Sequence, residues 1–261
     1  MNIKGFELNP AWLSSTHVKK LILKLDFGEF SECDCWHLPA LKTLHLTQLG
    51  SITYTLPESY LICFHSLETL FLDGFDLPIS VSLPALTTLR LSSCKLPPTF
   101  WDFPALLTLT LDNIVFSDET SEFLIALVNL RKLTLFLRKN MMTDCYINCP
   151  QLMNLDINTC MNTISKHPGK IIVLSHKICN FSSVGFFAIT FEESELETVN
   201  IKLRDQRYKT IASWKNMKDY YPRAIPMFPE VGSAKILTLD SETIEVLPGI
   251  FLPFSFSILK L

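Results

Sequence analysis

The chain has 261 residues, enough for one large domain or two small ones. Hydrophobic residues make up 48% of it and charged residues 19%, which supports a sizeable core and excludes a mostly disordered protein. The net charge of −3 provides no overall attraction to nucleic acid or acidic membranes, and the eight glycines never adopt the spacing of a phosphate-binding loop.

Residues 1–12 lack the apolar run of a secretory signal, and no stretch of about 18 apolar residues predicts a membrane span. We therefore expect a cytoplasmic or nuclear protein whose thiols stay reduced. The eight cysteines are Cys33, Cys35, Cys63, Cys94, Cys145, Cys149, Cys160 and Cys179.

A motif of the form Leu-x-x-Leu-x-Leu recurs along the chain. Seven clear copies begin at Val18, Leu41, Leu67, Leu86, Leu106, Leu130 and Leu152. Their steps of 19 to 26 residues match the period of leucine-rich repeats. Later copies begin at Leu196, Ala234 and Phe256. The gap after Leu152 predicts a degenerate copy near residues 171–174, and the gap after Leu196 leaves either one long unit or two poor ones.

Within each motif, apolar and polar residues alternate as in a strand with one buried face. Such a strand cannot bury that face alone, so stacking about ten units predicts an α/β leucine-rich-repeat solenoid with a curved parallel sheet. We expect one domain over residues 1–261, with an incomplete last repeat and short helical or irregular convex segments. Residues 95–98 are too proline-rich for a helix, whereas residues 117–119 predict the start of a helix carrying Phe123, Leu124 and Leu127.

A proline precedes the motif by two residues in four copies, where it disfavours helix and marks the start of a strand. These prolines are Pro39, Pro84, Pro104 and Pro150. Together with Leu-Pro-Ala-Leu-Lys-Thr-Leu-His-Leu at residues 38–46 and Leu-Thr-Leu-Asp-Ser-Glu-Thr-Ile-Glu-Val-Leu at 237–247, the pattern resembles the repeat region of plant F-box/LRR-repeat proteins, including those with an FBD domain.

The resemblance implies a target-recognition region of an SCF ubiquitin-ligase subunit. In that family the F-box recruits a Skp-family adaptor, and the repeats bind the protein to be modified. We expect neither an F-box nor an FBD domain within these residues, so an adaptor would be a partner only through an F-box outside them. The sequence thus predicts a non-enzymatic interaction module without a cofactor.

Residues that alternate with the buried leucines form three columns on the concave face. The candidate partner-binding residues on these columns are His45, Phe71, Arg90, Thr110, Asp73, Asp112, Lys132, Phe136 and Asp156. Outward aromatics beside an arginine are typical of binding hot spots. The alternative is an ordinary solvated strand surface, on which threonine is favoured by its β propensity.

Other functions stay open at this point. A receptor-like module could bind a small molecule with its partner in a pocket lined by Arg90 and Phe71. Residues 202–223 hold seven basic and two acidic residues with Trp214, Met217 and Tyr221 on one helical face, so they could bind RNA or an acidic partner. We favour a solvated basic helix for that segment. The spacings of Cys33 and Cys35, and of Cys145 and Cys149, do not favour a metal site.

Overall fold

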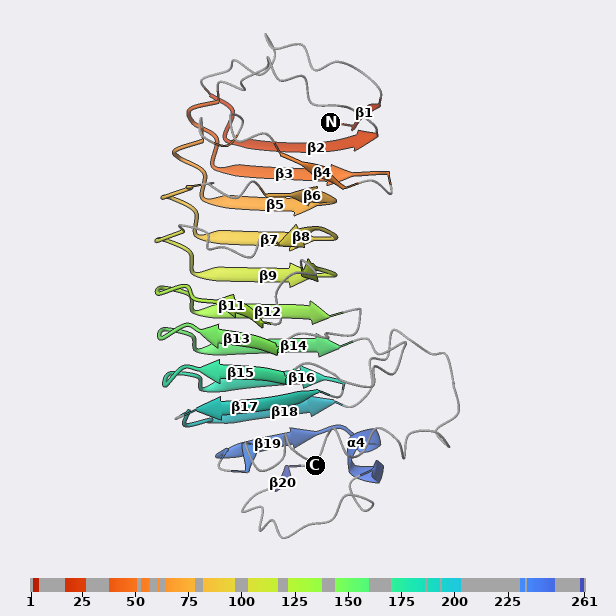
Figure 1. Cartoon of the computed structure of the whole chain (residues 1–261), viewed down its shortest axis with the longest axis vertical. Coiled ribbons are helices and arrows are strands. Elements are labelled where there is room, and N and C mark those ends of the chain that lie inside the picture. Colours follow the sequence, from red (N-terminus) through yellow and green to blue (C-terminus); the bar gives the residue numbers. More distant parts are fainter. Residues whose placement is uncertain are drawn as a thin grey trace. The chain divides into compact units, whose positions relative to one another are not determined.

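The computed structural model describes residues 2–4, 17–26, 38–50, 53–56, 61, 64–77, 82–96, 103–116, 122–137, 144–159, 170–185, 187–192, 194–202, 231–232, 234–246 and 259–260. These residues belong to two compact units, unit 1 over Met1–Glu119 and unit 2 over Thr120–Leu261. Each unit is a parallel β-solenoid with almost no helix (Figure 1). The predicted solenoid is confirmed, whereas a single domain over the whole chain stays a prediction.

The long strands of unit 1 pair in parallel and in chain order. They are β1 (Asn2–Lys4), β2 (Lys20–Asp26), β3 (Thr43–Gln48), β5 (Thr69–Asp73), β7 (Thr88–Ser92) and β9 (Thr108–Asp112). From β2 to β9 the motif leucines stay in register, so Leu44 is paired with Leu70 and Leu89 with Leu109. The repeat spacing in the sequence therefore becomes a continuous ladder of buried leucines.

A tight turn precedes each of the long strands β3, β5, β7 and β9. The amide of Leu41 donates to the Leu38 carbonyl at 3.0 Å, and the amide of Leu86 donates to the Leu83 carbonyl at 3.1 Å. The four motif prolines occupy the second position of such turns, where their fixed φ suits the turn and no amide is required. The prolines thus mark strand starts as predicted, through a β-turn.

The chain leaves the long strands through left-handed corners. Gly74, Ser93 and Asn113 follow β5, β7 and β9 with φ of 77°, 53° and 53°. Short strands follow the corners and form a second layer of two pairs. These are β4 (Tyr54–Thr55) with β6 (Phe75–Asp76), and β8 (Lys95–Leu96) with β10 (Val115–Phe116).

Unit 2 repeats the long-strand arrangement. Its strands are β12 (Lys132–Leu137), β14 (Asn154–Thr159), β16 (Asn180–Val184), β18 (Thr198–Lys202), β19 (Ile236–Leu239) and β20 (Leu259–Lys260). A six-residue helix, α4 (Ser241–Val246), follows β19. Because β18 pairs directly with β19, one long unit, rather than two poor ones, spans Leu196 to Ala234.

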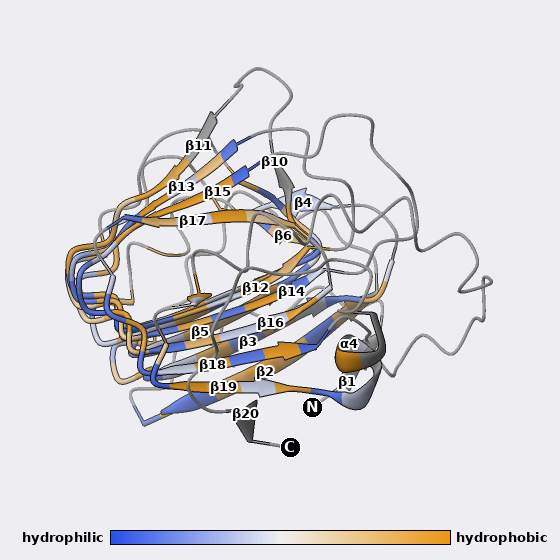
Figure 2. Ribbon diagram, turned by 90° about the horizontal axis from the view of Figure 1, so that it is seen from below, coloured by the Kyte–Doolittle hydropathy of each residue, from blue (hydrophilic) through white to orange (hydrophobic). Residues whose placement is uncertain are grey.

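The second layer of unit 2 is a four-stranded parallel sheet. It consists of β11 (Glu122–Ile125), β13 (Asp144–Asn148), β15 (Lys170–Leu174) and β17 (Ala188–Glu192). Figure 2 shows this layer facing the long strands β12, β14, β16 and β18, with hydrophobic residues alternating along the strands. The core of unit 2 lies between the layers, where Leu155 and Ile157 of β14 and Ile147 of β13 are fully buried.

Two local predictions were wrong. Phe123 and Leu124 lie in strand β11, not in a helix, because their neighbours in the second sheet supply backbone partners. Residues 171–174 do form a strand, but in this second sheet. The degenerate motif copy is instead Ile178-x-x-Phe181-x-Ser183, whose three residues are buried and whose strand β16 pairs with β14 and β18.

Candidate protein-binding face

The outer face of unit 1 comprises the side chains of β2, β3, β5, β7 and β9 that point away from the core. Its middle column runs Ile22, His45, Phe71, Arg90 and Thr110, and its third column includes Asp73, Ser92 and Asp112. Parallel strands lie about 4.8 Å apart, so register neighbours can touch. The structure thus brings six candidate residues onto one face: His45, Phe71, Arg90, Thr110, Asp73 and Asp112.

Two aromatic rings meet in the middle column. The rings of His45 and Phe71 lie edge to face, with centroids 4.1 Å apart and planes at 85°. Both side chains are partly exposed, and Ile22 continues the column toward β2 with 39% exposure. These three residues form a ridge of apolar and aromatic surface, a feature that binding hot spots share.

His45 favours its neutral form. Burial lowers the pKa of the imidazole below 6.5, and the positive charge of Lys20 lowers the pKa further. Its Nε2 is buried and has no hydrogen-bond partner within the described part of the chain. A neutral ring can be covered by a partner at a smaller desolvation penalty than a charged one.

Arg90 is the cation that β7 contributes to this face, beside Lys20 and Lys24 on β2. Its Nη2 lies 3.9 Å from Asp112 Oδ2, with 50% of the arginine side chain exposed and 11% of the aspartate side chain. The largely buried carboxylate stands on β9, on the side of β7 opposite Phe71, and its pairing leaves half of the arginine side chain accessible. Arginine in such a position can pair with a partner group through its planar donors.

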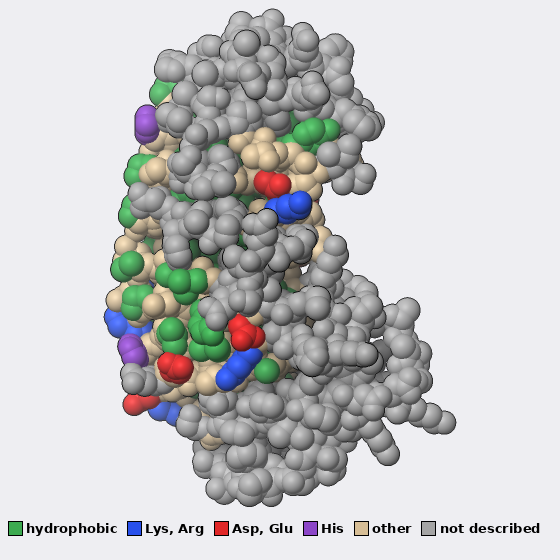
Figure 3. Space-filling model, in the orientation of Figure 1, with side chains coloured by type: hydrophobic (Ala, Val, Ile, Leu, Met, Phe, Trp, Pro, Cys, Tyr) green, Lys and Arg blue, Asp and Glu red, His purple; other side chains and the backbone are tan. Residues whose placement is uncertain are grey.

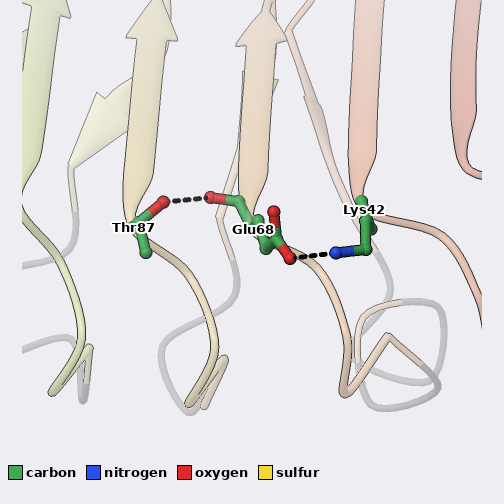
Figure 4. A network of polar contacts seen from close by, with 3 residues as sticks. All are labelled: Lys42, Glu68 and Thr87. Carbon is green, nitrogen blue, oxygen red and sulfur yellow. Dashed lines mark hydrogen bonds and ion pairs between the residues drawn. The ribbon is translucent and has the colours of Figure 1, made fainter.

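The first outward column of unit 1 consists of threonines. Thr43, Thr69, Thr88 and Thr108 lie in register on β3, β5, β7 and β9 and are partly exposed. At the strand starts beside this column, Lys42 Nζ pairs with Glu68 Oε1 at 2.5 Å, and Thr87 Oγ1 donates to the Glu68 carbonyl at 3.0 Å (Figure 4). These contacts link successive repeats along one edge.

The outer face of unit 2 is more polar and more internally paired. Lys132 Nζ lies 3.8 Å from Asp156 Oδ2, and Asn180 Nδ2 donates to Asn154 Oδ1 at 2.9 Å. Phe136 is partly exposed and has Asn158 as its register neighbour, so the candidates Lys132, Phe136 and Asp156 belong to this second face.

Sequence reasoning missed part of the unit 2 face. The missed residues are Asn180, Ser182 and Val184 of β16, which lie between the outward residues of β14 and β18. They were missed because the sequence analysis placed the degenerate copy about eight residues too early. Serine at the third motif position concealed the copy. The spacing of Ile178 and Phe181 was the available signal.

A further surface with apolar side chains lies on the second layer of unit 2, the sheet of β11, β13, β15 and β17. Leu124, Tyr146, Ile172 and Thr190 form its outward column, and Leu124 is 45% exposed. Figure 3 shows hydrophobic side chains gathered over these strands. The sequence analysis missed this column because it assigned Leu124 to a helix.

Of the described cysteines, Cys94, Cys145 and Cys149 are buried and Cys179 is partly exposed. Burial raises the pKa of Cys145 to about 12 and that of Cys149 to about 11, and both thiols are free. Cys33 and Cys35 lie outside the described residues. Within the described ranges, no three His, Cys, Asp or Glu side chains gather closely enough to hold a metal ion.

The remaining candidates are less defined. The basic segment has only Lys202 among the described residues, at the end of β18, so its helix and its RNA-binding alternative stay predictions. The pocket lined by Arg90 and Phe71 also stays a prediction. Among the residues that the structure describes, no helix has the length and apolar character that crossing a membrane requires.

Scans against protein-family models, curated proteins and solved structures find no match to this chain.

Proposed function

We propose that the chain is a non-enzymatic module that binds a protein target through the outer face of unit 1. The observation that carries the proposal is the in-register column of Ile22, His45, Phe71 and Arg90 on four neighbouring strands. Each residue stands on a strand hydrogen-bonded to its neighbours, so the face is rigid before binding and little ordering entropy would be lost.

We further propose that the solenoid is of the leucine-rich-repeat type and acts as the target-recognition region of an F-box/LRR-type ubiquitin-ligase subunit in the cytoplasm or nucleus. The motif period and the prolines at the strand starts support the repeat type. The second layer of described strands departs from the expected helical or irregular segments. A Skp-family adaptor is a partner on this proposal where an F-box forms part of the whole protein.

Affinity purification with matched variants tests the interaction. The wild-type chain, a Phe71→Ala/Arg90→Glu variant and a Phe136→Ala/Lys132→Glu variant are immobilised, and bound proteins are quantified by mass spectrometry. We expect at least one protein to bind the wild type and the unit 2 variant but not the unit 1 variant. Identical profiles for all three, with circular dichroism showing equal folding, would contradict the proposal.

A direct titration tests the ubiquitin-ligase role. A purified Skp-family adaptor is added to the protein as it is isolated from its native cells, and binding is measured by calorimetry. We expect the adaptor to bind. A protein that does not bind the adaptor would contradict the ligase role and leave the target-binding role to the affinity experiment.

A further inference from the structure

On β5, β7 and β9 the charges of the outer face of unit 1 do not balance, whereas Lys20 and Lys24 of the same face lie on β2. Arg90 faces the carboxylate of Asp112 at 3.9 Å, so these two opposite charges offset each other. Asp73 lies on the same face and has no ion pair within the described residues. One negative charge on β5, β7 and β9 is therefore left for a partner.

Asp73 stands next to the aromatic ridge. Asp73 and Phe71 are two residues apart on β5, so their side chains share one face. Ser92, the register neighbour of Asp73 on β7, has a short side chain and leaves room between Asp73 and Asp112. An aromatic ring beside a carboxylate is an arrangement that receives a cation with an apolar stem.

The surroundings do not supply that cation. His45 is neutral near pH 7 because burial and Lys20 lower its pKa. Lys24 is two strands from Asp73, about 10 Å at the usual strand spacing. On the core side, Cys94 has a pKa raised to about 12 by burial and by the carboxylates of Asp76 and Asp73, which agrees with a negative local field.

We infer that the partner of this face presents a lysine or arginine next to an apolar side chain, with Asp73 pairing the charge and Phe71 receiving the apolar group. The inference rests on the proposed protein-binding function and specifies the chemistry of the target. An acidic target would instead face the unpaired Asp73 and be repelled.

A peptide selection tests the inference. Phage-displayed random dodecapeptides are selected separately on the immobilised wild-type chain, on Asp73→Lys and on Asp156→Lys. The last variant makes the same charge change on the outer face of unit 2. We expect wild-type and Asp156→Lys pools enriched in Lys or Arg within two positions of an apolar residue, and an Asp73→Lys pool enriched in Asp or Glu. Wild-type-selected peptides should bind Asp73→Lys about tenfold more weakly.

A wild-type pool without basic enrichment, or the same enrichment on Asp73→Lys, would overturn the inference. Phe71→Ala separates this failure from failure of the proposed function. Peptides that lose binding on Phe71→Ala but show no basic preference leave the face as a binding surface and refute only its charge preference. Peptides that all retain binding on Phe71→Ala refute the face itself.

Discussion

The two units share one motif but build different second layers. Among the residues that the structure describes, the second layer of unit 1 consists of two pairs of two-residue strands, whereas that of unit 2 is a sheet of four strands, each of four or five residues. The long strands of both units have the same in-register ladder of buried apolar residues. The motif therefore determines the long strands but not the path that returns from them.

Proline limits the short strands of unit 1. Pro57, Pro78 and Pro97 follow β4, β6 and β8 by one or two residues, and proline can donate no ladder hydrogen bond. The second-layer strands β13, β15 and β17 of unit 2 occupy a different place in the repeat, because each ends shortly before the next long strand begins. They read Asp-Cys-Tyr-Ile-Asn, Lys-Ile-Ile-Val-Leu and Ala-Ile-Thr-Phe-Glu. Their β-branched and aromatic residues favour pleated, half-buried strands.

The largest expected effect comes from adding proline to the continuous second layer. Ile172 pairs with Tyr146 on one side and with Thr190 on the other, so Ile172→Pro should lower the free energy of unfolding by about 3 kcal/mol or more. Thr55→Pro in the two-residue strand β4 should cost less than about 1 kcal/mol, the value of one hydrogen bond, because the amides that donate to β6 belong to Tyr54 and Leu56. Urea unfolding followed by circular dichroism measures both, and equal losses would show that the two layers contribute alike.

The corners should also differ between the units. A Cβ on Gly185 would overlap Thr159 Oγ1 and lie 2.7 Å from the Thr159 carbonyl, while a Cβ on Gly74 would lie 2.8 Å from Gln48 Cβ. With φ of 95°, Gly185→Ala should destabilise unit 2 by about 1–3 kcal/mol. Gly74→Ala should cost less because its closest contact, 2.8 Å to Gln48 Cβ, is milder than the overlap at Gly185. Thermal melts measure both variants, and a neutral Gly185→Ala would contradict the observed corner.

The outer faces should differ in binding. Phe71→Ala should lower the affinity for the captured partner, or for a selected peptide, about 30-fold, or about 2 kcal/mol, because it removes the centre of the aromatic ridge. Phe136→Ala on unit 2 should change the affinity less than threefold, within the range of ordinary interface contacts. Biolayer interferometry compares the two. A larger loss for Phe136→Ala would move the binding face to unit 2.

The ridge of unit 1 should respond to pH. Folding lowers the pKa of His45 below 6.5, so the unfolded chain takes up this proton first as the pH falls. The contribution of neutral His45 is present above about pH 6.5 and is lost as the pH falls through that value toward the folded pKa. The free energy of unfolding of His45→Gln should therefore fall less steeply between pH 7 and 5 than that of the wild type. Urea unfolding at each pH measures both slopes.

A control for that pH experiment is available in the exposed His65 of the same unit. His65→Gln should leave the slope of stability against pH close to that of the wild type. A slope that changes equally in both variants would refute the assignment to His45.

The smallest expected effects are those of the edge ion pairs. Lys42–Glu68 in unit 1 and Lys235–Glu197 in unit 2, at 2.5 and 3.1 Å, have both side chains largely exposed. Each pair should contribute about 0–1 kcal/mol in a double-mutant cycle and less at high salt. A larger coupling in either unit would show that the strand edges stabilise the solenoid more than surface charges normally do.

Much of the fold was predictable because the repeat is a local signal. The register of Leu44, Leu70 and Leu89 follows from motif spacing alone, and so does the position of Phe71 and Arg90 on a common face. The prediction failed at Ile178-x-x-Phe181-x-Ser183, because a serine occupies the third apolar position and hides the motif. It failed again at Leu124, whose helical spacing to Leu127 conceals a strand that is stabilised by residues 20 or so positions away.

The sequence by itself determined the period, the buried ladder and the outward columns of each unit, because alternation within five residues decides which side of a strand faces the core. Only the tertiary structure decided the second layers, the corner conformations and the pairing of Arg90 with Asp112. Those features depend on neighbours one repeat away, whose contacts form only when successive turns of the solenoid stack.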